Sequence, residues 1–304
     1  MTAVPAPLAL SMGEPAGVGP EVISRAWAAL KGEGPVFAVI GDAALLRLQG
    51  QPVESVLALA DASAVFGRAI PVLNNRLPGP VTPGRPETAN AGAVANWIEQ
   101  AVNLALSGEA SGIVTAPIAK APLYAAGFGF PGHTEFLAHL AGGAEVVMML
   151  ACPALRVVPV TIHIPLAEVP QALTPALLSR SIEITHAALR RDFGLSEPRL
   201  ALAGLNPHAG EGGAMGREEL DFIAPLIRRY REAGMQIVGP LPADTMFHPA
   251  ARARYDAALC MYHDQALIPI KTIDFAGGVN VTLGLPFVRT SPDHGTAYDI
   301  AGQG

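Results

Sequence analysis

The stretch "AALCMYHDQALIPIK" (257–271) decides the fold, because it joins an apolar strand to a group of polar side chains. It opens on an apolar run without polar alternation, which is typical of a strand buried on both faces of a sheet. The run ends at His263 and Asp264, and Lys271 follows on the same stretch. Ligands of open α/β sheets bind at the carboxyl ends of strands, so we expect a functional site here.

Similar apolar runs recur along the chain, and helical segments separate them. We expect strands over 36–42, 112–117, 145–150, 156–164, 199–208, 236–240 and 257–264. Helices with readable ends are expected over about 88–108, 174–194 and 217–234, with Thr174 as the N-cap and Gly194 as the C-cap of the second. This alternation predicts an α/β protein with a largely parallel sheet.

The composition excludes several classes of protein. The 304 residues are half apolar and 15% charged, which argues against disorder and allows about two domains. A net charge of −6 without a Lys/Arg cluster argues against a nucleic-acid partner. No apolar stretch approaches the ~20 residues of a membrane helix, and the start lacks a basic signal region, so we expect a soluble cytoplasmic protein. Cys152 and Cys260 lie in strand-like runs and are expected to be reduced core residues.

Three of the eight histidines share one setting, since His163, His208 and His263 each lie at or near the end of a predicted strand. Such ends can converge in space despite wide separation in sequence. Three imidazoles meeting there would hold a divalent metal and leave positions open for a substrate. A structural role for each histidine is the alternative, because the chain has no short metal-binding motif such as H-x-x-x-H.

A second candidate site lies in "FPGHTEFLAHLAG" (130–142). His133 precedes a helical run there, and Thr134 is expected to be its N-cap. A helix N-terminus whose amides are unpaired suits an anion, especially beside an imidazole. An ordinary helix cap is the alternative.

Polar groups also gather in "GGVNVTLGLPFVRTSPDHGTAYDIAGQG" (277–304). Asn280 and Arg289 could hold a carboxylate or a phosphate, Arg289 through two parallel bonds. The run His294, Gly295, Thr296 and Ala297 offers close backbone approach to a flat ligand. By contrast, the glycine-rich "MGEPAGVGPE" (12–21) lacks the G-x-G-x-x-G dinucleotide fingerprint.

Seven segments, taken in order, resemble the 4-hydroxythreonine-4-phosphate dehydrogenase (PdxA) family of vitamin B6 (pyridoxal phosphate) biosynthesis, and the similarity covers essentially the whole chain. They are "GEPAGVGPE", "TAPIAK", "FPGHTEFLA", "LNPHAGEGGAMGREE", "GPLPADTMF", "MYHDQALIPIK" and "GGVNVTLGLPFVRTSPDHGTAYDIAG". The opening turn and the "HGTA…DIAG" loop also look like distant relatives of isocitrate and isopropylmalate dehydrogenase motifs, and those enzymes lack the Rossmann fingerprint too.

The resemblance implies a two-domain α/β fold of that kind, with the active site in a cleft between the domains. Residues 1–130 and 285–304 would form the first domain. Residues 131–284 would form the second domain, which carries the interface of a homodimer.

The resemblance also implies a role for each candidate residue. Family metal ligands fall on His163, His208 and His263, and the third histidine is contributed by the other subunit. Family substrate contacts fall on His133, Thr134, Lys271, Asn280 and Arg289. Asp244 and Asp264 match motifs beside the metal, and the nucleotide loop falls on residues 294–297.

The implied reaction is the metal-dependent oxidation of 4-phosphooxy-L-threonine by NAD or NADP. The product is a β-keto acid that decarboxylates to 3-amino-2-oxopropyl phosphate. The metal is open among zinc, cobalt and magnesium, and either Lys271 or Asp264 could transfer the proton. Gln303 replaces a common lysine, which leaves the choice between NAD and NADP open.

Two other functions compete with this one. A dehydrogenase of four-carbon sugar-acid phosphates, such as threonate or erythronate 4-phosphate, would use the same fold and motifs. A metal-dependent hydrolase or lyase could use the same histidines, although it would not need the "HGTA…DIAG" loop. The chain ends on a glycine-rich loop without a closing helix, so we expect further residues after Gly304.

Overall fold

The computed structural model describes residues 5–303, which divide into two compact units. The first unit comprises the residues up to Ala144 and those from Leu285 onward, and the second is Glu145–Gly284. The segment 131–144, which we expected in the second domain, therefore lies in the first unit. Phe136 of this segment packs against the rings of Phe128 and Phe130 just before it. The expected continuation past Gly304 lies outside the described residues.

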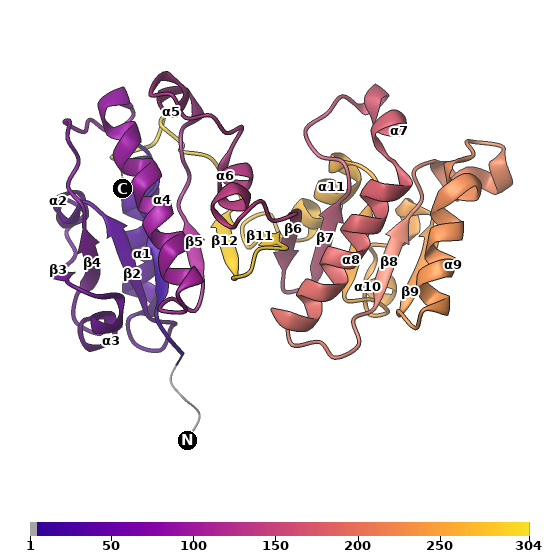
Figure 1. The fold of residues 1–304 in the computed structure, drawn as a ribbon, viewed down its shortest axis with the longest axis horizontal. Coiled ribbons are helices and arrows are strands. Elements are labelled where there is room, and N and C mark those ends of the chain that lie inside the picture. The colour runs from indigo at the N-terminus through magenta and orange to yellow at the C-terminus, as the bar shows by residue number, and fades with distance from the viewer. Residues whose placement is uncertain (1–4, 304) are drawn as a thin grey trace. The chain divides into compact units, whose positions relative to one another are not determined.

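The first unit is built on a parallel sheet in the order β3-β4-β2-β1-β5-β12. Its strands are β1 (Leu8–Ser11), β2 (Phe37–Gly41), β3 (Val53–Val56), β4 (Ile70–Asn74), β5 (Ile113–Thr115) and β12 (Arg289–Pro292). The strands expected over 36–42 and 112–117 are confirmed as β2 and β5. The yellow strand β12, from the end of the chain, lies beside the much earlier β5 (Figure 1).

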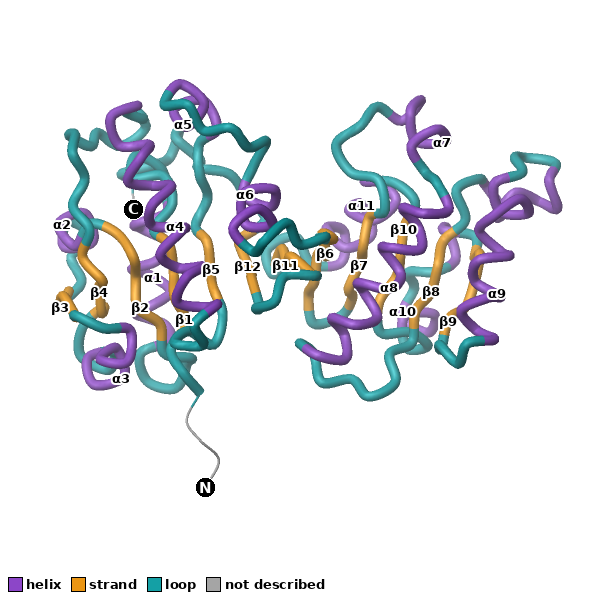
Figure 2. The backbone as a smooth tube through the Cα atoms, viewed as in Figure 1, coloured by secondary structure: helices purple, strands orange, loops and turns teal. Residues whose placement is uncertain are grey.

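Helices flank this sheet (Figure 2). They are α1 (Gly19–Leu30), α2 (Ala43–Arg47), α3 (Ala62–Val65), α4 (Ala91–Leu106), α5 (Lys120–Ala125) and α6 (His133–Leu140), with short 3-10 turns at Leu59–Asp61 and Thr88–Asn90. Trp27 of α1 and Trp97 of α4 are almost fully buried. Trp27 also donates its indole N–H to the Phe66 carbonyl at 2.8 Å, which satisfies the one polar atom of its buried ring.

The strands of the second unit follow the order β11-β6-β7-β10-β8-β9. Its strands are β6 (Val147–Cys152), β7 (Leu155–Pro159), β8 (Leu200–Ala203), β9 (Ile237–Leu241), β10 (Ala257–Cys260) and β11 (Val279–Leu283). Strands β7, β10, β8 and β9 are parallel, as expected, but β6 runs antiparallel to both β7 and β11. The link from β6 to β7 is too short for a parallel crossover, which needs a dozen or more residues.

The helices of the second unit include the one whose cap residues were predicted from the sequence. They are α7 (Val169–Ala172), α8 (Pro175–Arg191), α9 (Ala224–Glu232), α10 (Pro249–Arg252) and α11 (His263–Ile273), with 3-10 turns at Leu166–Glu168, Pro207–Gly213 and Ala243–Thr245 and a π turn at Glu219–Ile223. Thr174 caps α8 by accepting a hydrogen bond from the Leu177 amide at 3.2 Å, as predicted. Within residues 5–303, no helix combines the length and the apolar character that a membrane span requires.

Strand β10 is buried on both faces, which explains its unbroken apolar sequence. Leu259 packs on the side of α8, in a cluster that includes Leu178 and Ile182. Ala258 and Cys260 pack on the other side, in a cluster with residues of α11. Both cysteines are buried and form no disulfide, as expected.

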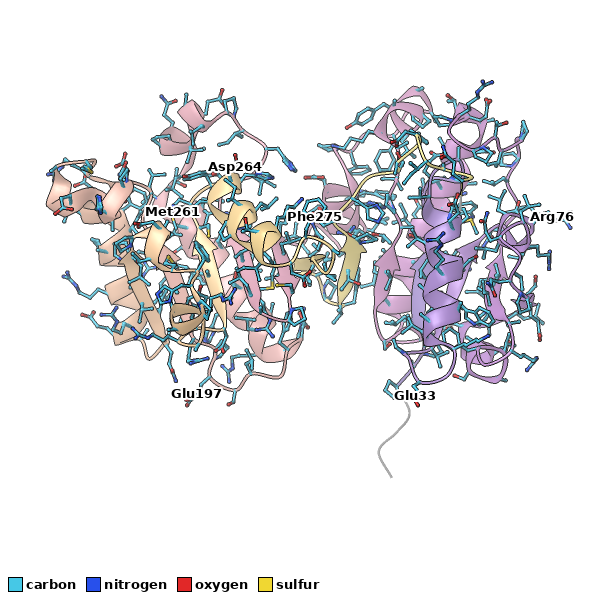
Figure 3. The ribbon with its side chains drawn as sticks, turned by 180° about the vertical axis from the view of Figure 1, so that it is seen from behind. Glu33, Arg76, Glu197, Met261, Asp264 and Phe275 are labelled. Carbon is cyan, nitrogen blue, oxygen red and sulfur yellow. The ribbon has the colours of Figure 1, made fainter. Side chains whose placement is uncertain are left out.

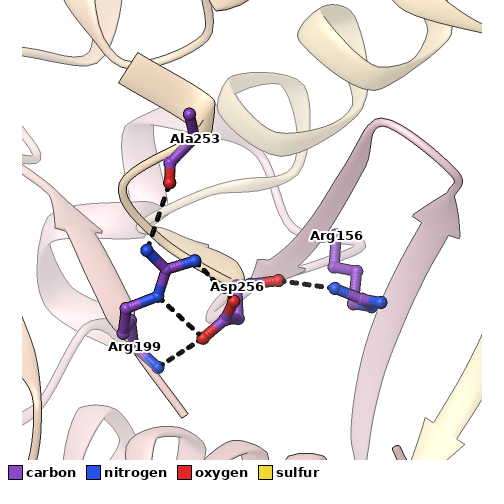
Figure 4. Close-up of polar contacts among 4 residues, drawn as sticks. All are labelled: Arg156, Arg199, Ala253 and Asp256. Atoms are coloured by element: carbon purple, nitrogen blue, oxygen red, sulfur yellow. Dashed lines mark hydrogen bonds and ion pairs between the residues drawn. The ribbon is translucent and has the colours of Figure 1, made fainter. Parts of the chain in front are cut away.

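An ion pair joins the amino ends of β8 and β10 (Figure 4). Arg199 donates to the Asp256 carboxylate from its backbone amide and from Nη2, each at 2.8 Å. Arg156 of β7 donates to the Asp256 carbonyl at 3.1 Å. Burial raises the pKa of Asp256, but the hydrogen bonds and charge of Arg199 outweigh it and lower that pKa overall. These contacts fix the register of three strands at one edge of the sheet.

Candidate functional site

The three strand-end histidines follow parallel strands of the second unit. Strands β7, β8 and β10 end at Pro159, Ala203 and Cys260, and each is followed within a few residues by one of the histidines. Because these strands are parallel, their carboxyl ends meet at one edge of the sheet, opposite the Arg199–Asp256 pair. His263 itself is the first residue of α11, so the strand expected over 257–264 ends earlier than predicted.

Two of the three histidines lie side by side. The ring centres of His163 and His263 are 5.8 Å apart. Both rings line a cavity of about 240 Å³, together with Tyr262 and Asp264. Two imidazoles on a tetrahedral metal, each with a metal–nitrogen distance of about 2.0–2.1 Å, place their ring centres about 5 Å apart. The observed separation is close to that value.

A carboxylate holds one of these rings. Asp264 lies at the start of α11 (Figure 3), and its Oδ1 accepts a hydrogen bond from Nδ1 of His263 at 2.6 Å. This bond assigns the proton to Nδ1 and leaves the lone pair of Nε2 for a ligand. The same arrangement orients and strengthens metal-binding imidazoles in general.

His208 occupies an unusual backbone segment. Five consecutive residues there have left-handed φ angles: His208 (51°), Ala209 (52°), Gly210 (81°), Glu211 (43°) and Gly212 (62°). Each non-glycine residue in this conformation costs roughly 1 kcal/mol. Other contacts must hold the segment in this form.

The described residues of one chain supply some, but not all, of the ligands that a metal ion needs. Across residues 5–303, no group of three or more His, Cys, Asp or Glu side chains is arranged to hold a metal ion. The His163–His263 pair, with Asp264 behind one ring, supplies two of the nitrogen donors that zinc or cobalt accepts. Each ring thus offers one nitrogen donor to a divalent metal; in the arrangement that the resemblance implies, His263 serves the site of the other subunit.

The polar cluster of the first unit is built around α6. Gly132, with φ −175° and ψ −170°, is the N-cap of this helix, and its carbonyl accepts from the Phe136 amide at 3.2 Å. His133 and Thr134 are therefore the first two residues of α6. The prediction that Thr134 is the N-cap was wrong, because the glycine before His133 adopts the extended cap conformation.

The buried Arg289 lies close enough to His133 in this unit to act on its charge. Arg289 is 3% exposed and donates from Nη2 to the Thr115 hydroxyl at 2.7 Å. Burial lowers the pKa of Arg289 to about 10, so the side chain stays charged at neutral pH. Burial, and then the charge of Arg289, lower the pKa of His133 to about 3. The His133 imidazole is therefore neutral.

The His133 imidazole has a polar atom without a partner in the described part of the chain. The Nε2 atom of His133 is buried and makes no hydrogen bond to the residues that the structure describes. A neutral imidazole, a buried guanidinium and the N-terminus of α6 all attract an anion. These groups together therefore suit a phosphate or carboxylate group.

The glycine-rich loops of the first unit pack against each other. The Val18 amide donates to the Thr296 carbonyl at 3.0 Å. A Cβ atom on Gly17 would lie 2.8 Å from that same carbonyl oxygen, so only glycine permits this approach. Ala297 has a φ of 45°. The run 294–297 is thus fixed on the turn that begins α1.

Lys271 and Asn280 lie in the second unit. Lys271 follows Asp264 by nearly two turns of α11, so the two side chains share one face of the helix. Its Nζ lies 5.8 Å from the ring centre of Phe275. Asn280 lies on β11, opposite Leu150 of β6. Asp244 lies in the turn after β9 and is exposed.

Comparison with known proteins identifies the family. The sequence model described as "Pyridoxal phosphate biosynthetic protein PdxA" matches residues 35–304. The chain belongs to the PdxA family. It is 60% identical over 306 residues to the 4-hydroxythreonine-4-phosphate dehydrogenase of Caulobacter vibrioides, covering 98% of this chain and 92% of the relative. The enzyme of the same name from Paracoccus denitrificans is 62% identical over 303 residues, with the same coverage.

A solved structure shares the PdxA fold. The crystal structure of 4-hydroxythreonine-4-phosphate dehydrogenase from Klebsiella pneumoniae superposes with a TM-score of 0.88 and 38% identity. The match covers 97% of this chain and 93% of that one. The family resemblance and the α/β fold predicted from the sequence are therefore confirmed.

Sequence reasoning gave no role to two buried polar residues that lie within the PdxA-like segments. Thr115 holds Arg289, from which it is separated by 174 positions in the chain. Gln265 accepts from the Met261 amide at 2.6 Å and donates to the Gly204 carbonyl at 2.8 Å. Gln265 thereby links the loop before His263 to the loop before His208. Its place in "MYHDQALIPIK" was a signal, but these two partners cannot be read from the sequence.

The lowered pKa of His133 predicts a pH dependence of folding. An unfolded histidine has a pKa of 6.5, so between pH 6.5 and about 3 the unfolded chain binds the extra proton. Stability contributed by the neutral ring is thus lost as the pH falls below 6.5. We expect His133→Gln to reduce the loss of unfolding free energy between pH 7 and pH 5 by about 2 kcal/mol.

Urea denaturation at the two pH values measures this difference. His139→Gln is the control, because His139 lies on the same helix and is exposed. That variant should keep the pH dependence of the parent. A His133→Gln protein with the parent's pH dependence would contradict the assignment of a buried neutral ring.

Proposed function

We propose that this PdxA-family protein oxidises the secondary alcohol of 4-phosphooxy-L-threonine, passing a hydride to NAD or NADP. The product is a β-keto acid, which loses carbon dioxide to give 3-amino-2-oxopropyl phosphate. The observation that carries this proposal is the 60% identity, over nearly the whole chain, to a relative named for this substrate. The geometry of both units supports it.

The first unit is proposed to bind the phosphate of the substrate. Arg289 supplies the positive charge, and Thr115 fixes the direction of its guanidinium group. The neutral His133 ring offers a buried Nε2 that has no partner in the described part of the chain. Thr134 and the first amides of α6 complete a site of the kind that binds phosphate at helix N-termini.

The second unit is proposed to bind a divalent metal through His163 and His208 of one chain, with His263 reaching the site from the other subunit. Nitrogen donors favour zinc or cobalt over magnesium, which prefers oxygen. When bound, the metal supplies Lewis-acid polarisation of the reacting oxygen. Asp264 holds the His263 ring in the tautomer that such a role requires.

Lys271 is proposed as the residue that moves the proton. Asp264 already accepts the hydrogen bond of His263, so its carboxylate serves to orient that ring. Lys271 shares a face of α11 with Asp264 and can take the proton of the substrate hydroxyl. Asn280 is proposed to hold another polar group of the substrate. The 294–297 loop, fixed on the turn before α1, is proposed to hold the nicotinamide nucleotide.

A homodimer is proposed for two reasons. The described part of one chain lacks a group of three metal donors, so a second copy is needed to complete the site. The second unit also exposes large apolar side chains: Leu166 is 68% exposed, Ile268 63% and Phe275 81%. Phe275 is labelled in Figure 3. A second copy of the chain would cover such residues.

The substrate can be tested directly. Purified, metal-supplemented protein would be offered 4-phosphooxy-L-threonine, D-threonate 4-phosphate and D-erythronate 4-phosphate in parallel, and NAD(P)H would be followed at 340 nm. We expect a clear preference for the amino acid. A preference for a sugar acid would keep the dehydrogenase but change its substrate, and no NAD(P)H from any of the three would favour a hydrolase.

A further inference from the structure

The left-handed segment 208–212 needs an explanation, because three of its five residues are not glycine. Within the segment and its flanks, backbone bonds join Ala209 to the Asn206 carbonyl at 3.1 Å and Met215 to the Gly210 carbonyl at 3.1 Å. These bonds close the loop but do not anchor it to the rest of the unit. The side chain of Glu219 bonds to Asn206 at the start of this loop.

Glu219 places a buried carboxylate inside this loop. The side chain is 2% exposed. Its Oε1 accepts from the Asn206 backbone amide at 2.8 Å, and its Oε2 accepts from Nδ2 of the same residue at 2.9 Å. A Cβ atom on Gly210 would lie 2.6 Å from Oε2, and one on Gly204 would lie 3.0 Å from Oε1. The backbone on both sides of His208 thus closes directly on the carboxylate.

The side-chain amide of Asn206 is held in one orientation. Its Nδ2 donates to Oε2 of Glu218 at 2.7 Å as well as to Glu219. Turning the amide over would point its oxygen at both carboxylates, which would repel it. Gly216 closes the other side, since a Cβ there would lie 2.2 Å from Nδ2. Asn206 therefore acts as a fixed donor to Glu219.

We propose that Glu219 is a positioning residue: it holds the left-handed segment 208–212 and thereby sets where the His208 imidazole points. The effect on metal binding rests on the proposed function, in which His208 is a ligand. The effect on the loop does not depend on that function.

Glu219→Gln tests the proposal with a change of one atom. The glutamine can still accept from the Asn206 backbone amide, but its NH₂ group then faces the NH₂ group of Asn206. Glu218→Gln is the matched control, because Glu218 makes one contact to Asn206 and its amide oxygen can replace the carboxylate oxygen there. The two variants change charge equally at adjacent positions.

The first measurement is hydrogen exchange of the backbone amide of Asn206 in metal-free protein, resolved by NMR. We expect exchange to speed up by about 10-fold or more in Glu219→Gln, because the loop opens locally, and to change much less in Glu218→Gln. Equal exchange in parent and Glu219→Gln would overturn the proposal. If Glu219→Gln does not fold, Gly216→Ala serves instead. It displaces the side-chain amide of Asn206 while keeping Glu219, and we expect it to speed up exchange of the Asn206 backbone amide.

The second measurement is zinc affinity, by competition with a coloured chelator. We expect Glu219→Gln to weaken binding by about 10- to 100-fold, the usual effect of losing a residue that orients a ligand. In a His208→Ala background the same change should add no further loss, since its effect passes through His208. A full further loss in that background would overturn the proposal.

The two measurements separate this proposal from the proposed function. If exchange at Asn206 rises while His208→Ala leaves zinc affinity unchanged, then Glu219 positions the loop but His208 is not a ligand. In that case the proposed metal site fails, and the positioning role of Glu219 stands.

Discussion

His208→Ala is expected to lower the rate of NAD(P)H formation from 4-phosphooxy-L-threonine by about 1,000-fold while the protein stays folded. Loss of a ligand removes the several kcal/mol of charge stabilisation that a bound metal supplies. The fold should survive because His208 is exposed and the neighbouring Ala209 already adopts the same left-handed conformation. Initial rates at 340 nm and a thermal unfolding curve measure the two effects.

The control for this variant is His248→Ala. His248 is also exposed, and its backbone, not its side chain, caps α10. We expect it to keep the activity and metal content of the parent. Full activity in His208→Ala would refute the assignment of His208 as a metal ligand.

Arg289→Met is expected to lower kcat/KM for the phosphorylated substrate by about 100- to 1,000-fold. Removing one partner of a buried, hydrogen-bonded ionic contact costs several kcal/mol of binding. Methionine fills a similar volume without the charge, so the pocket loses its attraction for an anion. Arg289→Lys keeps the charge, but a single ammonium group cannot hold Thr115 and also grip a phosphate with two bonds, so we expect an intermediate loss.

The non-phosphorylated 4-hydroxy-L-threonine makes this test specific. On this analogue Arg289→Met and the parent should differ by only a few-fold, because there is no phosphate to lose. Arg254→Met, which removes an exposed arginine of the second unit, should leave both substrates unaffected. An equal loss on both substrates would mean that Arg289 does not bind the phosphate.

The sequence predicted β2 and β5 to β10, but it missed five strands: β1, β3, β4, β11 and β12. Strand β10 was visible because Ala258 and Leu259 are both buried, on opposite sides of the sheet. Strands β3 and β12 have the sequences VESV and RTSP, which carry no such pattern. They become strands because neighbours far along the chain pair with them, and a local pattern does not record such partners.

The candidate residues were found by type and position, but their geometry depends on distant contacts. The strand-end rule brought attention to His163 and His263, which lie side by side. The left-handed turn at His208 depends on Glu219, which lies in the π turn that follows this loop. The capping glycine before His133 shows the same limit locally, since Thr134 is the better N-cap by residue type alone.

The measurement that tests the central claim most directly is NAD(P)H formation from 4-phosphooxy-L-threonine by protein stripped of metal with a chelator and then titrated with zinc or cobalt. We expect the stripped protein to be inactive and its activity to return with about one metal ion per subunit, the stoichiometry of one three-histidine site for each chain. Full activity in protein shown by metal analysis to be free of divalent ions would contradict the account.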